Sequence, residues 1–321
     1  MASASERASR GHFEGRIVAN RQLCREHFIF TIALQQFPPV RPGQFIQISC
    51  TEARDTAPRV CEFEHWHALK LIDADIVERQ ALLRRPFSIA SLRRAGESSV
   101  EIDIIHRVVG VGTTRLEKLC IGDAISIIGP LGNCFTIDQT RSFALLIGGG
   151  VGIPPMIFLA ESLAYVGIQT VGFVGATTAD LLSLSLSKDT TPKREPVPSL
   201  CIGEFSQHKT PAVVTTDDGS LGVKGLVTSA VDRFLNETPS SLEHIVLYTC
   251  GPEPMMMAVA KLAERYGLPA QVCMERAMAC GMSTCQSCVC KIRDQATAEG
   301  WRYQLVCTDG PVFDSRDIIW E

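Results

Sequence analysis

The stretch FALLIGGGVGIPPMIFLA, residues 143–160, decides the fold class of the second half of the chain. It starts with an apolar run typical of a buried strand, passes through a glycine-rich turn, and continues behind Pro154 and Pro155, which can open a helix. It carries no charge over 18 residues, the length of a membrane span. The glycines and prolines at its centre would break a spanning helix and leave backbone groups unsatisfied in lipid. We therefore interpret it as a strand, a turn and a helix start in a soluble protein.

The residues that follow repeat this alternation of strand and helix. Apolar runs predict strands over 143–147, 169–174, 212–216 and 245–248, and helical patterns lie over 155–165, 223–234 and 254–266. Strands that alternate with helices form right-handed βαβ units on a parallel sheet. We place this Rossmann-like α/β domain at residues 141–270.

The residues before this domain follow a different rhythm. Short runs of β-forming residues at 43–48, 86–90, 100–105 and 123–128 are separated by turn residues. This spacing predicts an antiparallel β-barrel over residues 13–140. A charged, irregular segment at 51–83 is interpreted as a surface insertion. Residues 1–12 lack the apolar core of a secretory signal and are expected to form a disordered tail.

Composition restricts the function further. The 321 residues are 45% hydrophobic and 21% charged, which excludes a disordered or collagenous chain. The net charge of -4 offers no basic surface for nucleic acid or for an anionic membrane. The 13 cysteines are too sparse for a disulfide-stapled secreted domain, so a reducing, cytoplasmic compartment is expected.

The cysteines concentrate in a small C-terminal domain, predicted at residues 271–321. Cys280, Cys285 and Cys288 form a C-x4-C-x2-C run, and Cys307 follows as a fourth thiol. This is the spacing of a plant-type [2Fe–2S] cluster, in which one loop curls three thiolates inward and a distant residue supplies the fourth. The spacing predicts these four residues as the metal ligands.

Two alternatives remain open for these cysteines. Structural zinc prefers paired C-x2-C units, and only Cys285 and Cys288 form one. Cys290 is a rival for the fourth position, although a thiol two residues after Cys288 would point to the other side of an extended chain. The cysteines could also carry no ligand.

The barrel region contains a possible flavin site. In Arg85-Pro86-Phe87-Ser88, a cation, an aromatic ring and a hydroxyl lie on one strand, where they could stack on a flavin and pair with its pyrophosphate. The alternative is that these residues begin a β-strand and bind no ligand. A second strand delivers Arg107 and then a Gly-x-Gly-Thr turn, ending in Gly112 and Thr113, before a helix expected at 114–119.

Two turns of the α/β domain are candidates for nicotinamide binding. Gly149, Gly150 and Gly152 follow the first strand, in a relative of the dinucleotide-binding turn in which Pro155 replaces the third glycine. Cys250-Gly251-Pro252-Glu253 ends the last long strand, at the edge where ligands bind such sheets. A plain turn and a buried cysteine are the alternatives. After the second strand, Asp180 would repel a 2′-phosphate, which favours NADH over NADPH.

The order of these modules resembles the ferredoxin reductase superfamily, and within it the electron-transfer subunits of dihydroorotate dehydrogenase B. The resemblance covers residues 15–313. It is carried by Arg85–Ser88 and by the segments 107–113, 216–220, 280–288 and 307–313, of which the cysteine loop and the Asp-Gly-Pro-Val-Phe tail are the most specific.

The resemblance implies FAD in the barrel, NAD in the α/β domain and a [2Fe–2S] cluster at the C-terminus. Carried over residue by residue, it implies flavin contacts at Arg85, Pro86, Phe87, Ser88, Ile105, His106, Arg107, Gly112 and Thr113, and cluster ligands at Cys280, Cys285, Cys288 and Cys307. His106 departs from the tyrosine usual in the family. The insertion at 51–83 and the long gap between Cys288 and Cys307 are also unusual.

These cofactors predict an oxidoreductase component that contributes no catalytic residue of its own. Nicotinamide exchanges two electrons at once and a [2Fe–2S] cluster one, and a flavin can exchange both. No motif is left for an organic acid, so the substrate chemistry is expected on another polypeptide. The resemblance implies an FMN-containing catalytic subunit that oxidises dihydroorotate to orotate in pyrimidine biosynthesis, in a heterotetramer with two copies of each subunit.

Two other functions stay open at this point. The same electron-transfer chain could serve another acceptor, such as a hydrogenase, a glutamate synthase or ferredoxin. Alternatively, the cysteine loop could belong to a non-enzymatic metal-binding or redox-sensing protein.

Overall fold

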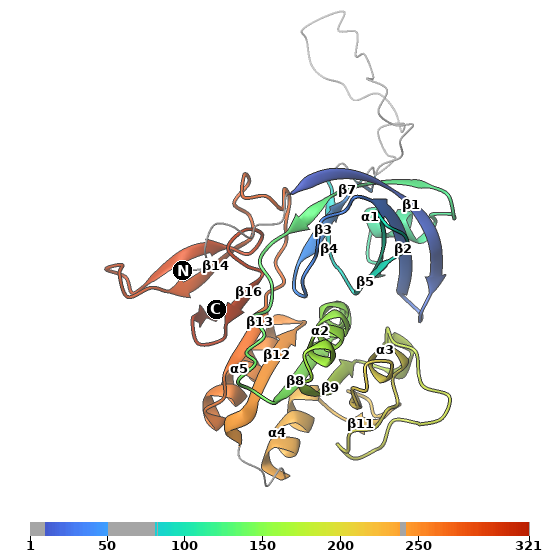
Figure 1. The fold of residues 1–321 in the computed structure, drawn as a ribbon. Helices are drawn as coiled ribbons and strands as arrows, with labels where there is room; N and C mark the ends of the chain where they lie inside the picture. The colour runs from blue at the N-terminus through green and yellow to red at the C-terminus, as the bar shows by residue number, and fades with distance from the viewer. Residues whose placement is uncertain (1–9, 51–80, 82, 238–241, 321) are drawn as a thin grey trace, which may run out of the picture.

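The structure is a computed structural model, and it describes residues 10–50, 81, 83–237 and 242–320. The predicted insertion at 51–83 therefore lies almost wholly outside the described residues. The described chain forms three bodies, a curled antiparallel sheet, an α/β layer and a small sheet beside them (Figure 1). The combination of barrel, parallel sheet and C-terminal domain predicted from the sequence is confirmed.

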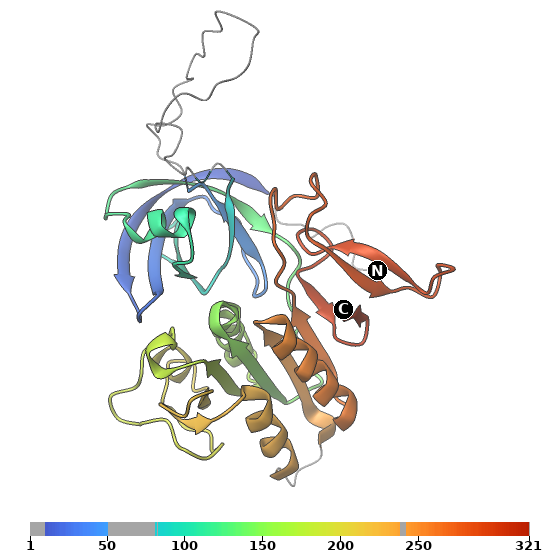
Figure 2. The ribbon, with the colours of Figure 1, turned by 180° about the vertical axis from the view of Figure 1, so that it is seen from behind.

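The first body is a seven-stranded antiparallel sheet in the order β4-β3-β7-β1-β2-β6-β5, which curls into a barrel (Figure 2). Alternating burial in its strands fills the barrel interior with aliphatic side chains. The strands are β1 Gly11–Gln22, β2 His27–Gln35, β3 Phe45–Ile48, β4 Arg85–Ser88, β5 Ser91–Arg94, β6 Ser99–Arg107 and β7 Ala124–Leu131, and helix α1 spans Val111–Glu117.

Two boundaries differ from those expected from the sequence. Strand β1 begins at Gly11, which pairs with Gly129 of β7, so the sheet extends two residues into the predicted tail. Helix α1 begins at Val111, three residues before the predicted start. The Thr113 hydroxyl accepts hydrogen bonds from the N–H groups of Val109 and Gly110, at 2.9 and 3.1 Å, which places this threonine inside the first turn.

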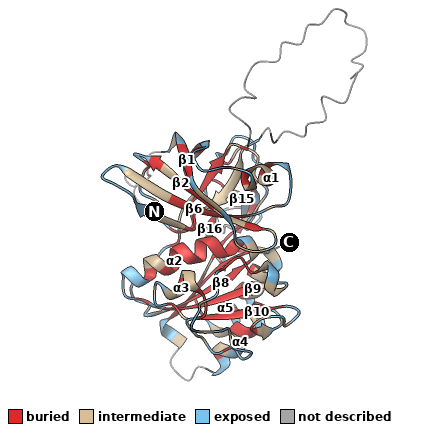
Figure 3. Cartoon of the chain, turned by 90° about the vertical axis from the view of Figure 1, so that its right-hand side faces the viewer, coloured by how far each residue is buried: buried red, intermediate tan, exposed pale blue. Residues whose placement is uncertain are grey.

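The second body is a sheet in the order β11-β10-β9-β8-β12-β13-β16, parallel except for β16. Helix α2 covers the face toward the barrel, where it is buried between the two bodies (Figure 3), and α4 and α5 cover the other face. The strands are β8 Phe143–Gly149, β9 Gln169–Ala176, β10 Ala212–Thr216, β11 Val223–Lys224, β12 Ile245–Cys250, β13 Ala270–Cys273 and β16 Val312–Asp314. The helices are α2 Ile153–Tyr165, α3 Gly203–Ser206, α4 Val227–Glu237 and α5 Glu253–Tyr266.

The third body grows out of the edge of this sheet. After β13 the chain leaves the nucleotide sheet and forms the cysteine loop. A small sheet follows, made of β14 Val289–Arg293, β15 Trp301–Leu305 and β17 Ile318–Ile319. Between β15 and β17 in the sequence, the chain returns to the nucleotide sheet and adds β16 beside β13. Part of the predicted C-terminal domain is thus the edge of the nucleotide sheet. One apolar core joins all three bodies, with Phe45 from the barrel, Met256 from α5 and Val306 from the third body.

The predicted helix over 223–234 is partly wrong. Val223 and Lys224 form the edge strand β11 beside β10, and α4 starts at Val227. Gly225, at φ +110°, separates the two elements, and a helix could not run through that backbone conformation. None of the helices in the described part of the chain is long and apolar enough to cross a membrane.

Candidate functional site

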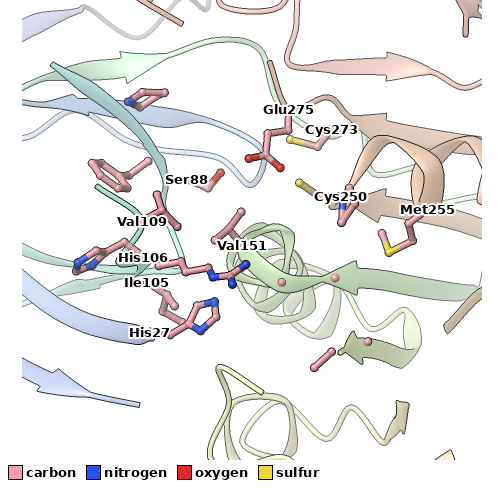
Figure 4. Close-up of a pocket in the computed structure, with 18 of the residues that line it drawn as sticks. His27, Ser88, Ile105, His106, Val109, Val151, Cys250, Met255, Cys273 and Glu275 are labelled. Carbon is pink, nitrogen blue, oxygen red and sulfur yellow. The ribbon is translucent and has the colours of Figure 1, made fainter. Parts of the chain in front are cut away.

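A cavity of about 840 Å³ lies between the barrel and the nucleotide sheet. Figure 4 shows its two walls, with His27, Ser88, Ile105 and His106 on the barrel side and Cys250, Cys273 and Glu275 on the sheet side. The structure brings the predicted flavin residues and most of the predicted nicotinamide residues together in this one cavity. They are Arg85, Pro86, Phe87, Ser88, Ile105, His106, Arg107, Gly112, Thr113, Gly149, Gly150, Cys250 and Pro252; Gly152, Gly251 and Glu253 do not line it.

His106 is the polar group of the barrel wall that most needs a partner. Its side chain is 2% exposed, and neither ring nitrogen has a hydrogen-bond partner. Burial lowers its pKa to about 4, so the ring is neutral at physiological pH. The edges of Phe30 and Phe87 pack near it, with ring centroids 5.3 and 6.0 Å away. Because His106 lines the cavity, a heteroaromatic ligand bound against it is the group best suited to supply a hydrogen bond that the protein itself does not make.

The cations of the barrel wall differ in how far they are already paired. Arg85 donates to the carbonyl of Leu83 at 3.0 Å and has no carboxylate partner among the described residues. Arg107 forms an ion pair with Glu26, with both Nε and Nη2 2.7 Å from Oε2. Arg85 is therefore the better placed of the two to neutralise a phosphate.

The two predicted nicotinamide turns meet backbone to backbone. Strands β8 and β12 are neighbours, with Gly148 aligned with Cys250. A Cβ on Gly152 would lie 2.2 Å from the carbonyl oxygen of Cys250, and Gly251 has a φ of +151°. These two glycines, predicted as cofactor contacts, therefore allow the turns to pack against each other rather than lining the cavity.

Glu253 also has a role other than lining the cavity. It begins α5, and its carboxylate accepts two hydrogen bonds from Arg276, at 2.5 and 2.8 Å. This pairing lowers the pKa of Glu253. The sequence could not indicate it, because the two residues are 23 positions apart.

Cys273 and Glu275 are cavity residues that the sequence reasoning missed. Cys273 ends β13 and is aligned with Cys250 of β12, and Figure 4 shows both thiols and the Glu275 carboxylate on the same side of the cavity. The hydrogen bond with Cys273, burial and the nearby Glu275 charge raise the pKa of Cys250 well above its ordinary value. Burial also raises the pKa of Glu275. The alternating run Ala270-Gln271-Val272-Cys273, shortly after a predicted helix, was the available signal.

The cysteine loop is shaped to hold negatively charged sulfur. The Cys280 sulfur accepts from the N–H groups of Met282 and Cys285, both at 3.4 Å. The Cys307 sulfur accepts from Ser283 N–H at 3.3 Å, although the two residues are 24 positions apart. Backbone donors aimed at thiol sulfurs are the environment of an iron–sulfur cluster, and this donor set fits one.

The remaining cysteines of the loop complete this picture. The N–H of Cys307 donates to the Cys288 sulfur at 3.4 Å. A hydrogen bond with Ser287 is the main cause that lowers the pKa of Cys285 to about 6. Cys290 lies on β14, and its thiol donates to the Gln304 carbonyl at 3.7 Å. Across the described residues, no three His, Cys, Asp or Glu side chains converge on a single metal position.

A cation from the barrel reaches the end of β9. Arg25, in the turn between β1 and β2, forms an ion pair with Asp180 at 3.1 Å and donates its N–H to the Asp180 carbonyl. The neighbouring Thr177 and Leu181 line the cavity. Residues next to Asp180 in the sequence do not indicate this cation, because Arg25 comes from the other domain.

Comparison with known proteins agrees with this geometry. Residues 275–319 match the model of the iron-sulfur cluster binding domain of dihydroorotate dehydrogenase B. The chain is 30% identical to the dihydroorotate dehydrogenase B (NAD(+)) electron transfer subunit of Caldanaerobacter subterraneus, over 97% of this chain and 100% of that protein, and 33% identical to that of Streptococcus mutans, over 85% and 97%. A structure of NADH-dependent reduced ferredoxin-NADP oxidoreductase superimposes with a TM-score of 0.69 at 25% identity, over 95% of this chain and 90% of that one. The chain belongs to the family of dihydroorotate dehydrogenase B electron-transfer subunits.

Proposed function

We propose that this chain transfers electrons between NAD(H), FAD and a [2Fe–2S] cluster, and to or from a catalytic subunit that oxidises dihydroorotate to orotate in pyrimidine biosynthesis. The observation that carries the proposal is the single cavity between the barrel and the nucleotide sheet. It is lined by the barrel motif at Arg85–Ser88 and by the turns at Gly149 and Cys250. A flavin on the barrel side and a nicotinamide on the sheet side would share it.

The residues of this chain position the cofactors and exclude water. When bound, FAD would supply both two-electron exchange with nicotinamide and one-electron exchange with a cluster. Arg85 would neutralise phosphate charge, and His106 would hydrogen-bond the flavin. The close contact between Gly152 and Cys250 fixes the backbone surface against which the nicotinamide would lie. The buried thiol of Cys250 remains protonated, because its pKa is raised, and so adds no charge to this surface.

The cluster would be held by Cys280, Cys285, Cys288 and Cys307. The support is the set of backbone N–H groups that point at the sulfurs of Cys280, Cys288 and Cys307. Cys290 is assigned no ligand role, because its thiol is buried in β14 and donates toward Gln304. In this division of roles, the cysteine loop would hold the cluster and the barrel would hold the flavin.

A catalytic partner subunit follows from membership of an electron-transfer subunit family. We infer that this partner carries FMN and that two copies of each subunit assemble, in the cytoplasm. None of the twelve described cysteines forms a disulfide, which supports a reducing compartment.

The test is a pair of cysteine variants purified anaerobically. Cys285→Ser should remove the visible iron–sulfur absorption and leave the flavin bound, because the cavity residues lie in other elements. NADH-dependent dye reduction from the flavin should persist while electron delivery to the partner stops. Cys290→Ser is the matched control and should keep the cluster. Loss of the cluster in the control would overturn the ligand assignment, and wild-type protein without flavin would overturn the function.

The choice of partner is tested separately. Affinity purification of the tagged chain from its native cell should recover a flavin-containing subunit with dihydroorotate-oxidising activity. Recovery of a hydrogenase or glutamate synthase subunit instead would assign the same electron-transfer chain to another acceptor.

A further inference from the structure

Gln47 carries a buried amide with no partner in the protein. It lies in the middle of β3 and is 0% exposed, and neither its Nε2 nor its Oε1 has a hydrogen-bond partner. A buried amide without hydrogen bonds is unfavourable, because it has lost its bonds to water and gained none in return. Such a side chain normally contacts a group that satisfies it.

The direction of the side chain follows from the pleat of β3. Ile46 and Ile48 point into the barrel and belong to its interior core. Phe45 points the other way and packs in the core that contains Cys288 and Cys307. Because side chains alternate along a strand, Gln47 lies on the same face as Phe45, toward the cysteine loop.

The contact on that face is Gly281, the residue after Cys280. A Cβ built on Gly281 would lie 2.3 Å from Gln47 Nε2 and 2.9 Å from its Cγ. Gly281 has a φ of +68°, so the loop turns sharply at this point. The Gln47 amide thus fills the space that a side chain at position 281 would take, directly against the backbone of the loop.

Gln47 also lies next to the strand of the barrel motif. In the register of β3 and β4 it is aligned with Pro86, between Arg85 and Phe87. Gln47 therefore contacts the cysteine loop from a strand that is paired with the flavin-site strand.

We propose that Gln47 is a positioning residue whose side-chain amide donates a hydrogen bond to sulfur at the Cys280 end of the cluster and thereby raises its reduction potential. The inference rests on the proposed function, since it requires the cluster. Reduction adds negative charge to the cluster, and a donor aimed at its sulfur stabilises the reduced form more than the oxidised form. The backbone donors to the Cys280 sulfur, from Met282 and Cys285, act in the same direction.

The test is an EPR-monitored redox titration of the full-length chain with its cluster. Gln47→Met keeps the length of the side chain and removes the donor. We expect the equilibrium constant for one-electron reduction of the cluster to fall about tenfold, which corresponds to about 59 mV. Gln47→Leu, which has neither the donor nor the acceptor, should shift the potential in the same direction. The matched control is Ile46→Val, a buried change on the same strand that points into the barrel, and it should leave the potential unchanged.

The outcomes separate this inference from the proposed function. Wild-type protein without stoichiometric iron and sulfide would overturn the function before any variant is compared. A cluster of unchanged potential in Gln47→Met, at full iron content, would overturn the role of Gln47. Should Gln47→Met fail to fold, the potential of Gln47→Leu decides, and an unchanged value there also overturns the role of Gln47. An equal shift in Ile46→Val would mean that the strand, rather than the amide, sets the potential, which contradicts the proposal.

Discussion

Glu253 and Arg276 form a two-point ion pair that joins the start of α5 to the segment leading into the cysteine loop. The Arg276 Nη1 lies 2.5 Å from Glu253 Oε2, and Nη2 lies 2.8 Å from Oε1. The planar guanidinium matches the carboxylate in this geometry, so the pair fixes direction as well as distance. It connects the edge of the cavity with the body that carries the cysteines.

Replacing Glu253 with alanine should lower the free energy of unfolding by about 1 kcal/mol, the scale of a partly exposed ion pair. The pKa of Glu253 is lowered in the folded chain, so its contribution is present above the ordinary carboxylate pKa and is lost as the pH falls through the lowered value. Urea unfolding at neutral and acidic pH measures this. The difference between wild type and variant should shrink in acid. Glu264→Ala, at an exposed position of the same helix, is the control and should show no such change.

Replacing Arg85 and replacing its neighbour Arg84 should have different effects, the first on flavin binding and the second on the stability of the barrel. Arg85 lines the cavity, whereas Arg84 donates to the Ser126 carbonyl and hydroxyl at 2.8 and 2.7 Å, on β7. Arg85→Ala should weaken FAD binding by about 1.5–3 kcal/mol, the worth of a hydrogen bond to a charged group. Arg84→Ala should lower stability and leave FAD affinity intact. Flavin retained after dialysis reports the affinity, and equal retention in Arg85→Ala and wild type would contradict the assignment.

His106 should make the cofactor-free chain less stable in mild acid. Its pKa is about 4 in the folded protein and 6.5 as the ordinary value, so the unfolded chain binds the proton first. Stability is therefore complete above pH 6.5 and falls as the pH drops toward about 4, by up to about 3 kcal/mol. His106→Phe cannot titrate, and its urea midpoint should depend less on pH over this range. Parallel pH profiles for the two proteins would show that the imidazole is not the cause.

Local sequence patterns predicted the parts of the molecule that depend on near neighbours. The alternation after Phe143 gave the parallel sheet, because hydrophobic periodicity is a local property. The spacing of Cys280, Cys285 and Cys288 likewise reports one loop. The predicted tail was too long because Gly11 is held by Gly129, a partner 118 positions away along the chain that no local pattern reveals.

The parts that were missed depend on contacts between distant segments. Cys273 reaches the cavity only because β13 adds to the sheet beside β12. Gly152 was assigned to the cofactor because of its motif. In the structure, the absence of a side chain at Gly152 allows the backbone of Cys250 to approach it closely. Arg25 and Asp180 come from different domains, so neither residue indicates the other in the sequence.

The aligned thiols of Cys250 and Cys273 predict a reactivity change. The pKa of Cys250 is raised first of all by its hydrogen bond with Cys273, so its thiolate fraction is small. Cys273→Ala should lower that pKa and speed alkylation of Cys250 by iodoacetamide at a fixed, mildly alkaline pH, measured by peptide mass spectrometry. Cys201→Ala, which removes a buried thiol at another position, should not change the rate. An unchanged rate in Cys273→Ala would mean that burial alone protects Cys250.

Asp180 is expected to control the choice between NADH and NADPH. Its carboxylate neutralises Arg25 at 3.1 Å, beside Thr177 and Leu181 of the cavity wall. In wild type we expect NADH to be used with the higher kcat/KM, because the acid repels a 2′-phosphate and occupies the cation that could bind one.

Asp180→Asn should therefore raise kcat/KM for NADPH by about tenfold, the equivalent of about 1.4 kcal/mol, and change that for NADH little. Arg25 keeps its position in the variant, since its N–H still donates to the backbone carbonyl of residue 180. Glu237→Gln is the control, because it breaks an exposed ion pair of the same kind with Arg233, on α4. Dye reduction with each nucleotide measures the ratio. A ratio that stays constant in Asp180→Asn would show that the 2′ position binds elsewhere, and a wild-type preference for NADPH would refute the assignment of NADH.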